Sequence, residues 1–506
     1  MPTMITATSS KAASTPRPTP PSSRPLTHQL RVCHCCHRNH QSAARSSSTS
    51  TATSPRAHRG TRHTPRDSPS RRPRSTSTAH RQRSTTSKPS VGRKIFLDLD
   101  GHVTTNPSWN SSYTSGQPIT SDPFDLDGSP TTFNDIEATR ITEIWQQVVE
   151  DYAPFDVDVT TIDPGTSGLT FSGGSDTTYG VRVVISPTNW FLSATGANSG
   201  GVAYVGTYRS SVSPPAFVFS ATLGNTTKKV AEASSHEAGH TLGLRHDGTS
   251  TATYYAGHGD WAPIMGNSYY RSITQWSKGE YPDANNTGQD DMALISSLVG
   301  YTPDDHANTA ASATPTTPGT NINALISTIN DTDVYTLNVP AGTLTATLAP
   351  TGQPTNLHAR IELRDTAGTI IATATPTQAV GWTDTITTNI PAGTYTIHIT
   401  NTAWLTPTTG FSNYATTGTY TLTTHHPPTT PTTDTTTTTT AATITTSTTT
   451  TTTIQPTTTT IPSTTTASTT TTIQPEITPT VTTTPTTVTT KTTGKLEAPG
   501  QVRRGK

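Results

Sequence analysis

The feature that most constrains this chain is a short run from His236 to Asp247, which reads HEAGHTLGLRHD. His236 and His240 are four residues apart, so on a helix both imidazoles project from the same face. Gly243 marks the expected end of that helix, because a left-handed backbone conformation is cheapest for glycine. The chain then turns back and offers His246. The run therefore predicts a helix whose end gathers three imidazoles at one point.

Three protein ligands and one open position define a catalytic rather than a structural zinc site. We therefore predict that Zn²⁺ is held by His236, His240 and His246. Glu237 flanks the same helix face, where it can hydrogen-bond the attacking water without binding the metal, which is the position of a general base. The competing interpretation is a helix with solvent-exposed histidines, and the extended spacing of the run disfavours it.

The run resembles the motif of the metzincin zinc peptidases, His-Glu-x-x-His-x-x-Gly-x-x-His followed by a Met-turn. Asp247, after the third histidine, is most similar to the adamalysin branch, and Pro263–Gly266 resembles the Met-turn. The resemblance implies that Met265 packs beneath the zinc and binds nothing. Two residues after this methionine stands Asn267 rather than a tyrosine, so no fifth tyrosine ligand can be assigned.

Other segments extend these resemblances beyond the run. The chain is similar to bacterial reprolysin-like secreted peptidases in Phe96–His102, Ala153–Val159 and Trp261–Gly266. It is similar to the bacterial pre-peptidase C-terminal domain in Asp331–Tyr335, Pro340–Thr343 and Pro391–Tyr395. The first resemblance implies a peptidase, and the second implies a secreted accessory domain that is usually not catalytic.

Hydrophobic patterning predicts an α/β (α+β) region with a mainly parallel twisted sheet, followed by an all-β sandwich. Expected helices cover 133–153, with a capping box from Thr132 to Asp135, then Thr226 or Thr227 to about Leu242, and Asp290–Val299. Expected strands of the first region are 95–99, 157–160, 181–185, 201–205 and 216–219. Short strands with glycine-containing turns are expected over 320–424. In the family that the chain resembles, substrate adds to an edge strand above the zinc, and Gly201–Tyr204 is our candidate for it.

Composition sets the outer limits of the folded regions. Only 30% of the 506 residues are hydrophobic, so part of the chain lacks the apolar side chains for a core. We expect a disordered Ser/Thr/Pro/Arg-rich segment over 1–91 and a metzincin-like peptidase domain over 92–303. A β-sandwich is expected over 304–425, and a disordered Thr/Pro-rich stalk or linker over 426–506.

The distribution of charged residues and cysteines limits which partners and which cross-links the folded regions can have. Residues 1–90 contain 16 of the 33 Lys and Arg and a single acid, which leaves 17 cations against 32 acids in the rest. An acidic folded part predicts no nucleic-acid binding. The three cysteines all lie in Cys33–Cys36, so the folded regions cannot contain disulfides. The cluster Cys33–His37 matches no common zinc module, and a latency thiolate that caps the zinc is the less favoured alternative.

The sequence thus predicts a zinc-dependent endopeptidase that acts on proteins or peptides. No apolar run reaches the roughly 18 residues of a membrane span, and no signal peptide is visible at Met1. The resemblance nevertheless implies an extracellular protein, secreted or attached to a cell surface through its Thr-rich tail. Two alternatives stay open: a non-catalytic surface or adhesion protein that retains the zinc-binding fold, and a metal-dependent hydrolase of non-peptide bonds.

Overall fold

The computed structural model describes residues 32–36, 85–352 and 354–426. Its largest sheet has six strands, in the spatial order β1 (Val32–Cys36), β7 (Ser199–Tyr204), β8 (Ala216–Phe219), β6 (Tyr179–Ser186), β2 (Arg93–Asp98) and β5 (Asp158–Thr160). The pairs from β8 to β5 are parallel, whereas β7 is antiparallel to both β8 and β1. The prediction of a mainly parallel sheet within an α/β region is confirmed.

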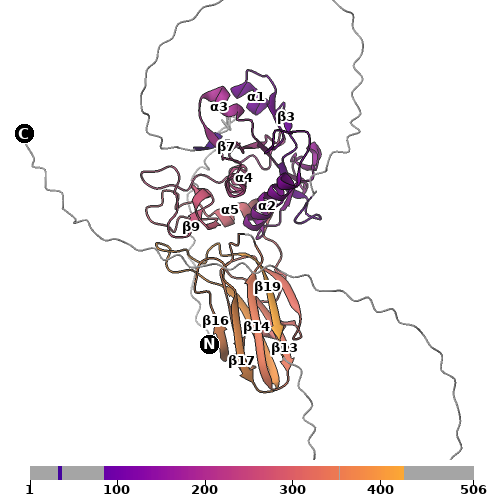
Figure 1. Ribbon diagram of the computed structural model, residues 1–506, viewed down its shortest axis with the longest axis vertical. Helices are drawn as coiled ribbons and strands as arrows, with labels where there is room; N and C mark the ends of the chain where they lie inside the picture. Colours follow the sequence, from indigo (N-terminus) through magenta and orange to yellow (C-terminus); the bar gives the residue numbers. More distant parts are fainter. Residues whose placement is uncertain (1–31, 37–84, 353, 427–506) are drawn as a thin grey trace, which may run out of the picture. The chain divides into compact units, whose positions relative to one another are not determined.

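Helices cover both faces of this sheet, which explains why strands β5, β7 and β8 are buried along their whole length. Val183 of β6 belongs to a core shared with α2 (Asp135–Tyr152), α4 (Thr227–Thr241) and α5 (Asp291–Val299). The next residue, Val184, points to the opposite face and packs with α1 (Pro107–Tyr113) and α3 (Trp190–Thr195). Figure 1 shows α2 and α4 side by side, and both contribute to the first core.

The start of α2 differs from the prediction. The predicted capping box from Thr132 to Asp135 is wrong, because the cap is Asn134, whose side chain accepts hydrogen bonds from the backbone N–H groups of Ile136 and Glu137. The Glu137 carboxylate accepts the Asn134 N–H in return. Asparagine and glutamate therefore form the reciprocal pair, two residues later than the predicted threonine and aspartate.

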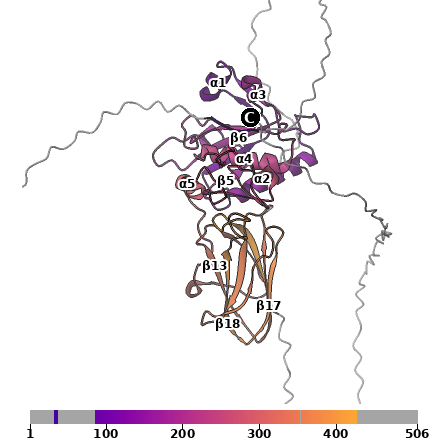
Figure 2. The same ribbon diagram turned by 90° about the vertical axis from the view of Figure 1, so that its left-hand side faces the viewer.

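Residues 304–425 are rich in strands, which form two further sheets. One contains β11 (Thr314–Pro315), β13 (Thr332–Val339), β18 (Gly393–Asn401), β15 (Ala359–Arg364) and β16 (Ile370–Ala374). The other contains β12 (Asn321–Ile326), β19 (Gly418–His425), β14 (Gly342–Pro350) and β17 (Asp384–Ile390). Both sheets contribute to one hydrophobic core, and Figure 2 shows β13, β17 and β18 running along this region.

The remaining elements are short. Two strand pairs join β3 (His102–Thr104) to β4 (Ile119–Ser121) and β9 (Trp261–Pro263) to β10 (Ile273–Gln275). Single 3₁₀ turns cover Thr166–Gly168, Ser268–Tyr270 and Ala310–Ser312. No helix in the described part of the chain combines the length and apolar character needed to span a bilayer.

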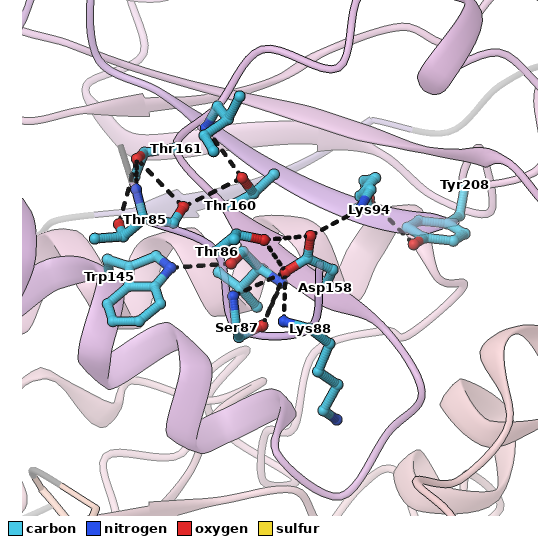
Figure 3. Close-up of polar contacts among 12 residues, drawn as sticks. Thr85, Thr86, Ser87, Lys88, Lys94, Trp145, Asp158, Thr160, Thr161 and Tyr208 are labelled. Atoms are coloured by element: carbon cyan, nitrogen blue, oxygen red, sulfur yellow. Dashed lines mark hydrogen bonds and ion pairs between the residues drawn. The ribbon is translucent and has the colours of Figure 1, made fainter. Parts of the chain in front are cut away.

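The expectation of disorder throughout 1–91 is wrong for two segments, Val32–Cys36 and residues 85–91. Figure 3 shows how Thr86, Ser87 and Lys88 surround the buried carboxylate of Asp158. Burial alone would raise the pKa of this carboxyl, but hydrogen bonds from the Lys88 N–H and the Lys94 ammonium outweigh it and hold the pKa below its usual value. Polar contacts of this kind leave no hydrophobic period in the sequence. Hydrophobic patterning therefore did not predict that these residues are ordered. The rest of the predicted disorder, in 1–91 and 427–506, lies outside the described residues.

Hydrogen bonds also join the strand-rich residues to the helix-containing part, within one compact unit of the chain. The backbone N–H of Asn356 donates to a carboxylate oxygen of Glu150 at 3.0 Å, and its side-chain amide donates to Asp151 at 2.9 Å. Gln275 donates to the carbonyl of Asn356 at 2.8 Å. All four residues are buried, so these contacts occur where water does not compete for them.

Candidate metal centre

Helix α4 positions the first two histidines of the run. It is buried over its last three turns, and its end shows the predicted glycine conformation, with φ of 102° at Gly243. The Leu244 N–H bonds to the carbonyl of Gly239 at 3.1 Å and the Gly243 N–H bonds to that of His240 at 2.9 Å. This is the Schellman pattern, in which left-handed glycine satisfies the last carbonyls and reverses the chain. The reversal carries His246 back toward the helix.

The structure brings together the three predicted ligands. One ring nitrogen from each of His236, His240 and His246 lies within 4.8 Å of the others. On the far side of the rings, Nδ1 of His236 contacts the carbonyl of Ile264 at 2.8 Å, and Nδ1 of His240 contacts that of Leu244 at 2.8 Å. Because a carbonyl only accepts, each of these Nδ1 atoms carries the hydrogen, and each Nε2 presents its lone pair to the centre.

The Nε2 atoms of the three histidines are better placed to bind a cation than to satisfy one another by hydrogen bonds. Nε2 of His236 is buried and has no hydrogen-bond partner among the described residues. Nε2 of His240 and Nε2 of His246 are 3.0 Å apart. Burial lowers the pKa of His236 to about 4, so this imidazole is neutral at physiological pH, as a metal ligand must be. Three converging imidazoles, two of them with a tautomer fixed by a carbonyl, match the donor set of Zn²⁺.

Glu237, the predicted general base, is completely buried next to strand β7. A Cβ atom built on Gly201 would lie 2.7 Å from both Cγ and Oε1 of this glutamate. Strand β7 therefore passes so close to the carboxylate that only a glycine fits there. The sequence prediction placed Gly201–Tyr204 next to the site, and this stretch lies in the strand that contacts Glu237. The prediction that it is an edge strand is wrong, because β1 pairs with the outer side of β7 and makes it an inner strand.

The predicted Met-turn lies under the helix. Met265 is completely buried, and a Cβ atom on Gly239 would lie 2.8 Å from its sulfur. The carbonyl of Met265 accepts the N–H of Asp247 at 2.9 Å, which fixes the segment after the third histidine. Methionine packed against a glycine of the ligand helix agrees with the packing role that the resemblance implies.

One aromatic residue near the histidines was missed by the sequence analysis. The ring of Tyr254 has its centroid 4.2 Å from that of His246 and 6.2 Å from that of His236. No motif spacing marks this tyrosine, because it comes from the loop between the third histidine and the Met-turn. Two further tyrosines follow the Met-turn: Tyr270 is largely exposed, whereas the hydroxyl of Tyr269 lies beside Gly200.

The strand-rich region contacts the site through a chain of hydrogen bonds. Asn356 accepts from the Gln275 side chain, and the Gln275 carbonyl accepts the N–H of Ile264 at 2.9 Å. Ile264 in turn holds the Nδ1 of His236 through its own carbonyl. The orientation of one predicted ligand is therefore linked by direct contacts to a residue of the second region.

One family model matches the stretch of sequence that contains the candidate site. Residues 186–277, which contain the whole run and the Met-turn, match Reprolysin_5, the metallo-peptidase family M12. This match confirms the resemblance to a metallopeptidase over that segment. No match to a curated protein was found.

Three solved structures illustrate the distant similarities that were found. The chain is similar to the pre-peptidase C-terminal domain of collagenase from Bacillus anthracis, at 19% identity over 22% of this chain and 93% of that one, with a TM-score of 0.17. It is similar to PliG, a periplasmic lysozyme inhibitor from Aeromonas hydrophila, at 16% identity over 22% and 97% of the two chains, with a TM-score of 0.14. A carbohydrate-binding module of a Cellvibrio mixtus lichenase gives 16% identity, 18% and 65% coverage, and a TM-score of 0.12.

Proposed function

We propose that residues 92–303 form a metzincin-like zinc endopeptidase domain. The observation that carries the proposal is the convergence of His236, His240 and His246, with the Nδ1 atoms of the first two turned away toward carbonyls. When bound there, Zn²⁺ would lower the pKa of a water towards about 7 and polarise the scissile carbonyl. The match of this segment to a metallopeptidase family supports the same assignment.

Glu237 supplies the proton transfer in this proposal. Its carboxylate accepts a proton from the attacking water and then delivers it to the leaving amine. It is buried beside β7, so the carboxylate acts in a site from which bulk water is largely excluded. In this proposal the substrate is a protein or peptide.

The other regions take supporting roles. We propose that 304–425 is a sandwich domain of the pre-peptidase C-terminal type without chemistry of its own, and that the protein acts outside the cell. The main alternative, an inert surface or adhesion protein, would not require the complete set of three histidines and the buried glutamate. A hydrolase of non-peptide bonds is the second alternative, and the substrate panel below separates it from a peptidase.

The test is hydrolysis of casein and of quenched fluorescent peptides, with and without a chelator, by the full chain and by Glu237→Gln. The amide keeps the shape of the carboxylate but cannot accept a proton, so we expect unchanged zinc content and a loss of about 10²–10⁴ in kcat/KM. Glu280→Gln, which changes a partly exposed carboxylate, is the matched control and should retain native activity. Near-native kcat/KM in a zinc-loaded Glu237→Gln protein would refute the mechanism.

A further inference from the structure

Asn356 lies in the loop that joins β14 to β15, and it is buried at 6% exposure. Three of its polar groups bond to the helix-containing part of the chain. Its backbone N–H donates to Glu150 and its side-chain amide donates to Asp151, both at the end of α2. Its carbonyl accepts from the side chain of Gln275 in β10. One residue of the strand-rich region therefore contacts two separate elements at once.

A first route from Asn356 to the metal centre runs through β10 and the Met-turn segment. The indole N–H of Trp261 donates to Oε1 of Gln275 at 2.9 Å, so the Gln275 amide presents its Nε2 to the Asn356 carbonyl. The Gln275 carbonyl accepts the Ile264 N–H, and the Ile264 carbonyl meets Nδ1 of His236. Strands β9 and β10 pair over only three residues each, and a two-stranded sheet of that size depends on outside contacts for its stability.

A second route reaches the helix that carries the same histidine. The Asn356 amide donates to Oδ1 of Asp151 at 2.9 Å, and Oδ2 of this carboxylate accepts the hydroxyl of Ser235 at 2.6 Å. Ser235 is the residue before His236 on α4. All of these side chains are buried, so a broken bond here leaves a polar atom without water to replace its partner.

We propose that Asn356 is a positioning residue for the metal centre, which holds the His236 imidazole in the orientation that binds zinc. This inference rests on the proposed function. The two routes start from different polar groups of Asn356, and they end on the ring Nδ1 of His236 and on the residue that precedes it. Together they fix both the rotation of the ring and the helix turn that carries it. The strand-rich region then supports metal binding through a residue that is not itself a ligand.

The competing interpretation is that Asn356 only joins the two regions. Tyr414 has a joining role of this kind, because its buried hydroxyl accepts the Met292 N–H of α5 at 2.9 Å and donates to Asp290. This contact lies outside both routes to His236. Tyr414→Phe therefore removes a buried contact between the same two regions and is the matched control.

The experiment exchanges donor and acceptor in the Asn356–Asp151 pair of the full-length, zinc-loaded chain. Asn356→Asp sets two carboxyl groups against each other. The double exchange Asn356→Asp/Asp151→Asn restores one amide and one carboxylate, and the new amide oxygen can still accept the Ser235 hydroxyl. The readouts are the rate of zinc release to a chromogenic chelator, the Tm of the metal-free protein and kcat/KM on a quenched peptide.

We expect Asn356→Asp to release zinc about 10-fold faster and to lower kcat/KM, an effect near the lower end of that found when a direct partner of a metal ligand is removed. The double exchange should return zinc release to within about 2-fold of the native rate. Asn356→Ala, which only removes the amide, should speed release about 3-fold and provides the test if Asn356→Asp does not fold. Tyr414→Phe should lower Tm but release zinc at the native rate.

Native zinc release in Asn356→Asp, or in Asn356→Ala where the former does not fold, would overturn the inference. Equal acceleration in Tyr414→Phe would also overturn it, because loosening the two regions would then be sufficient. So would a double exchange that releases zinc as fast as Asn356→Asp. Zinc release needs no activity, so the expected release pattern without peptide hydrolysis by any of the proteins would refute the peptidase assignment and leave the positioning role standing. A native chain that binds no zinc would overturn both.

Discussion

Gly201 offers a direct test of how closely strand β7 approaches the candidate general base. In the Gly201→Ala variant the new methyl group would lie 2.7 Å from Cγ and Oε1 of Glu237 and 2.8 Å from the carbonyl oxygen of Phe217. Neither neighbour can move freely, because the glutamate is completely buried and the carbonyl belongs to the adjacent strand β8. The substitution must therefore displace either β7 or the carboxylate.

The size of the effect follows from these contacts. Relief of the overlap requires a shift of roughly 0.7–1 Å to reach ordinary contact distance, and overpacking of this kind costs about 1–3 kcal/mol. For a domain of this size the loss corresponds to a Tm about 2–12 °C lower. A displacement near 1 Å of a catalytic group costs up to about 10²-fold in rate, so we expect kcat/KM to fall about 10- to 100-fold.

Tm by calorimetry, zinc content and kcat/KM on a peptide are measured together on purified protein. Gly288→Ala is the matched control, because a Cβ atom there meets no heavy atom within 4 Å, and it should behave as the native chain. The three heavy atoms nearest to the new methyl group belong to Glu237 and Phe217 and not to a histidine, so zinc content should stay native in both variants. Native Tm and native kcat/KM in Gly201→Ala would refute the placement of β7 against the base.

Three further predictions use the same protein. His240→Ala should abolish stoichiometric zinc binding, because two imidazoles hold zinc poorly, and undiminished zinc by metal analysis would contradict the ligand assignment. Tyr254→Ala removes a ring that packs at a tilt against His246 and should speed zinc loss to a chelator by roughly 2- to 10-fold, whereas Tyr254→Phe should not. Burial raises the pKa of Glu150 from 4.5 to about 7, so the folded state holds this proton more tightly than the unfolded state. The free energy of unfolding should therefore fall by about 3 kcal/mol as pH rises from about 4.5 to 7, and urea titrations should show a smaller fall for Glu150→Gln, whose amide oxygen can still accept the Asn356 N–H.

The sequence correctly predicted the elements whose residues follow a regular pattern within a short stretch of chain. The ligand helix, its glycine stop and the return of His246 follow from spacing alone, and the buried strands of the sheet follow from continuous apolar runs. The cap of α2 was misplaced because Thr132 and Asn134 are both good caps, and only the Glu137 carboxylate decides between them. N-cap propensity alone ranks Thr132 and Asn134 as nearly equal.

The parts that were missed depend on contacts between distant residues. Thr86 and Ser87 both donate to the carboxylate of Asp158, more than 70 residues away along the chain, and no composition rule detects such a pair. The same holds for Tyr254, whose place beside His246 is set by the fold of a loop. A polar segment can therefore be ordered although its sequence resembles that of an unstructured one.

The adjacent glycines of β7 illustrate how a locally unfavourable pattern can carry structural meaning. Glycine weakens a strand because it has no side chain to pack, so Gly200–Gly201 within an apolar strand calls for a compensating reason. The structure supplies one on each side. A Cβ on Gly200 would approach Leu223 at 2.8 Å, and one on Gly201 would meet the carboxylate of Glu237. The two glycines of β7 are therefore explained by close neighbours from other elements and not by the strand propensity of their own segment.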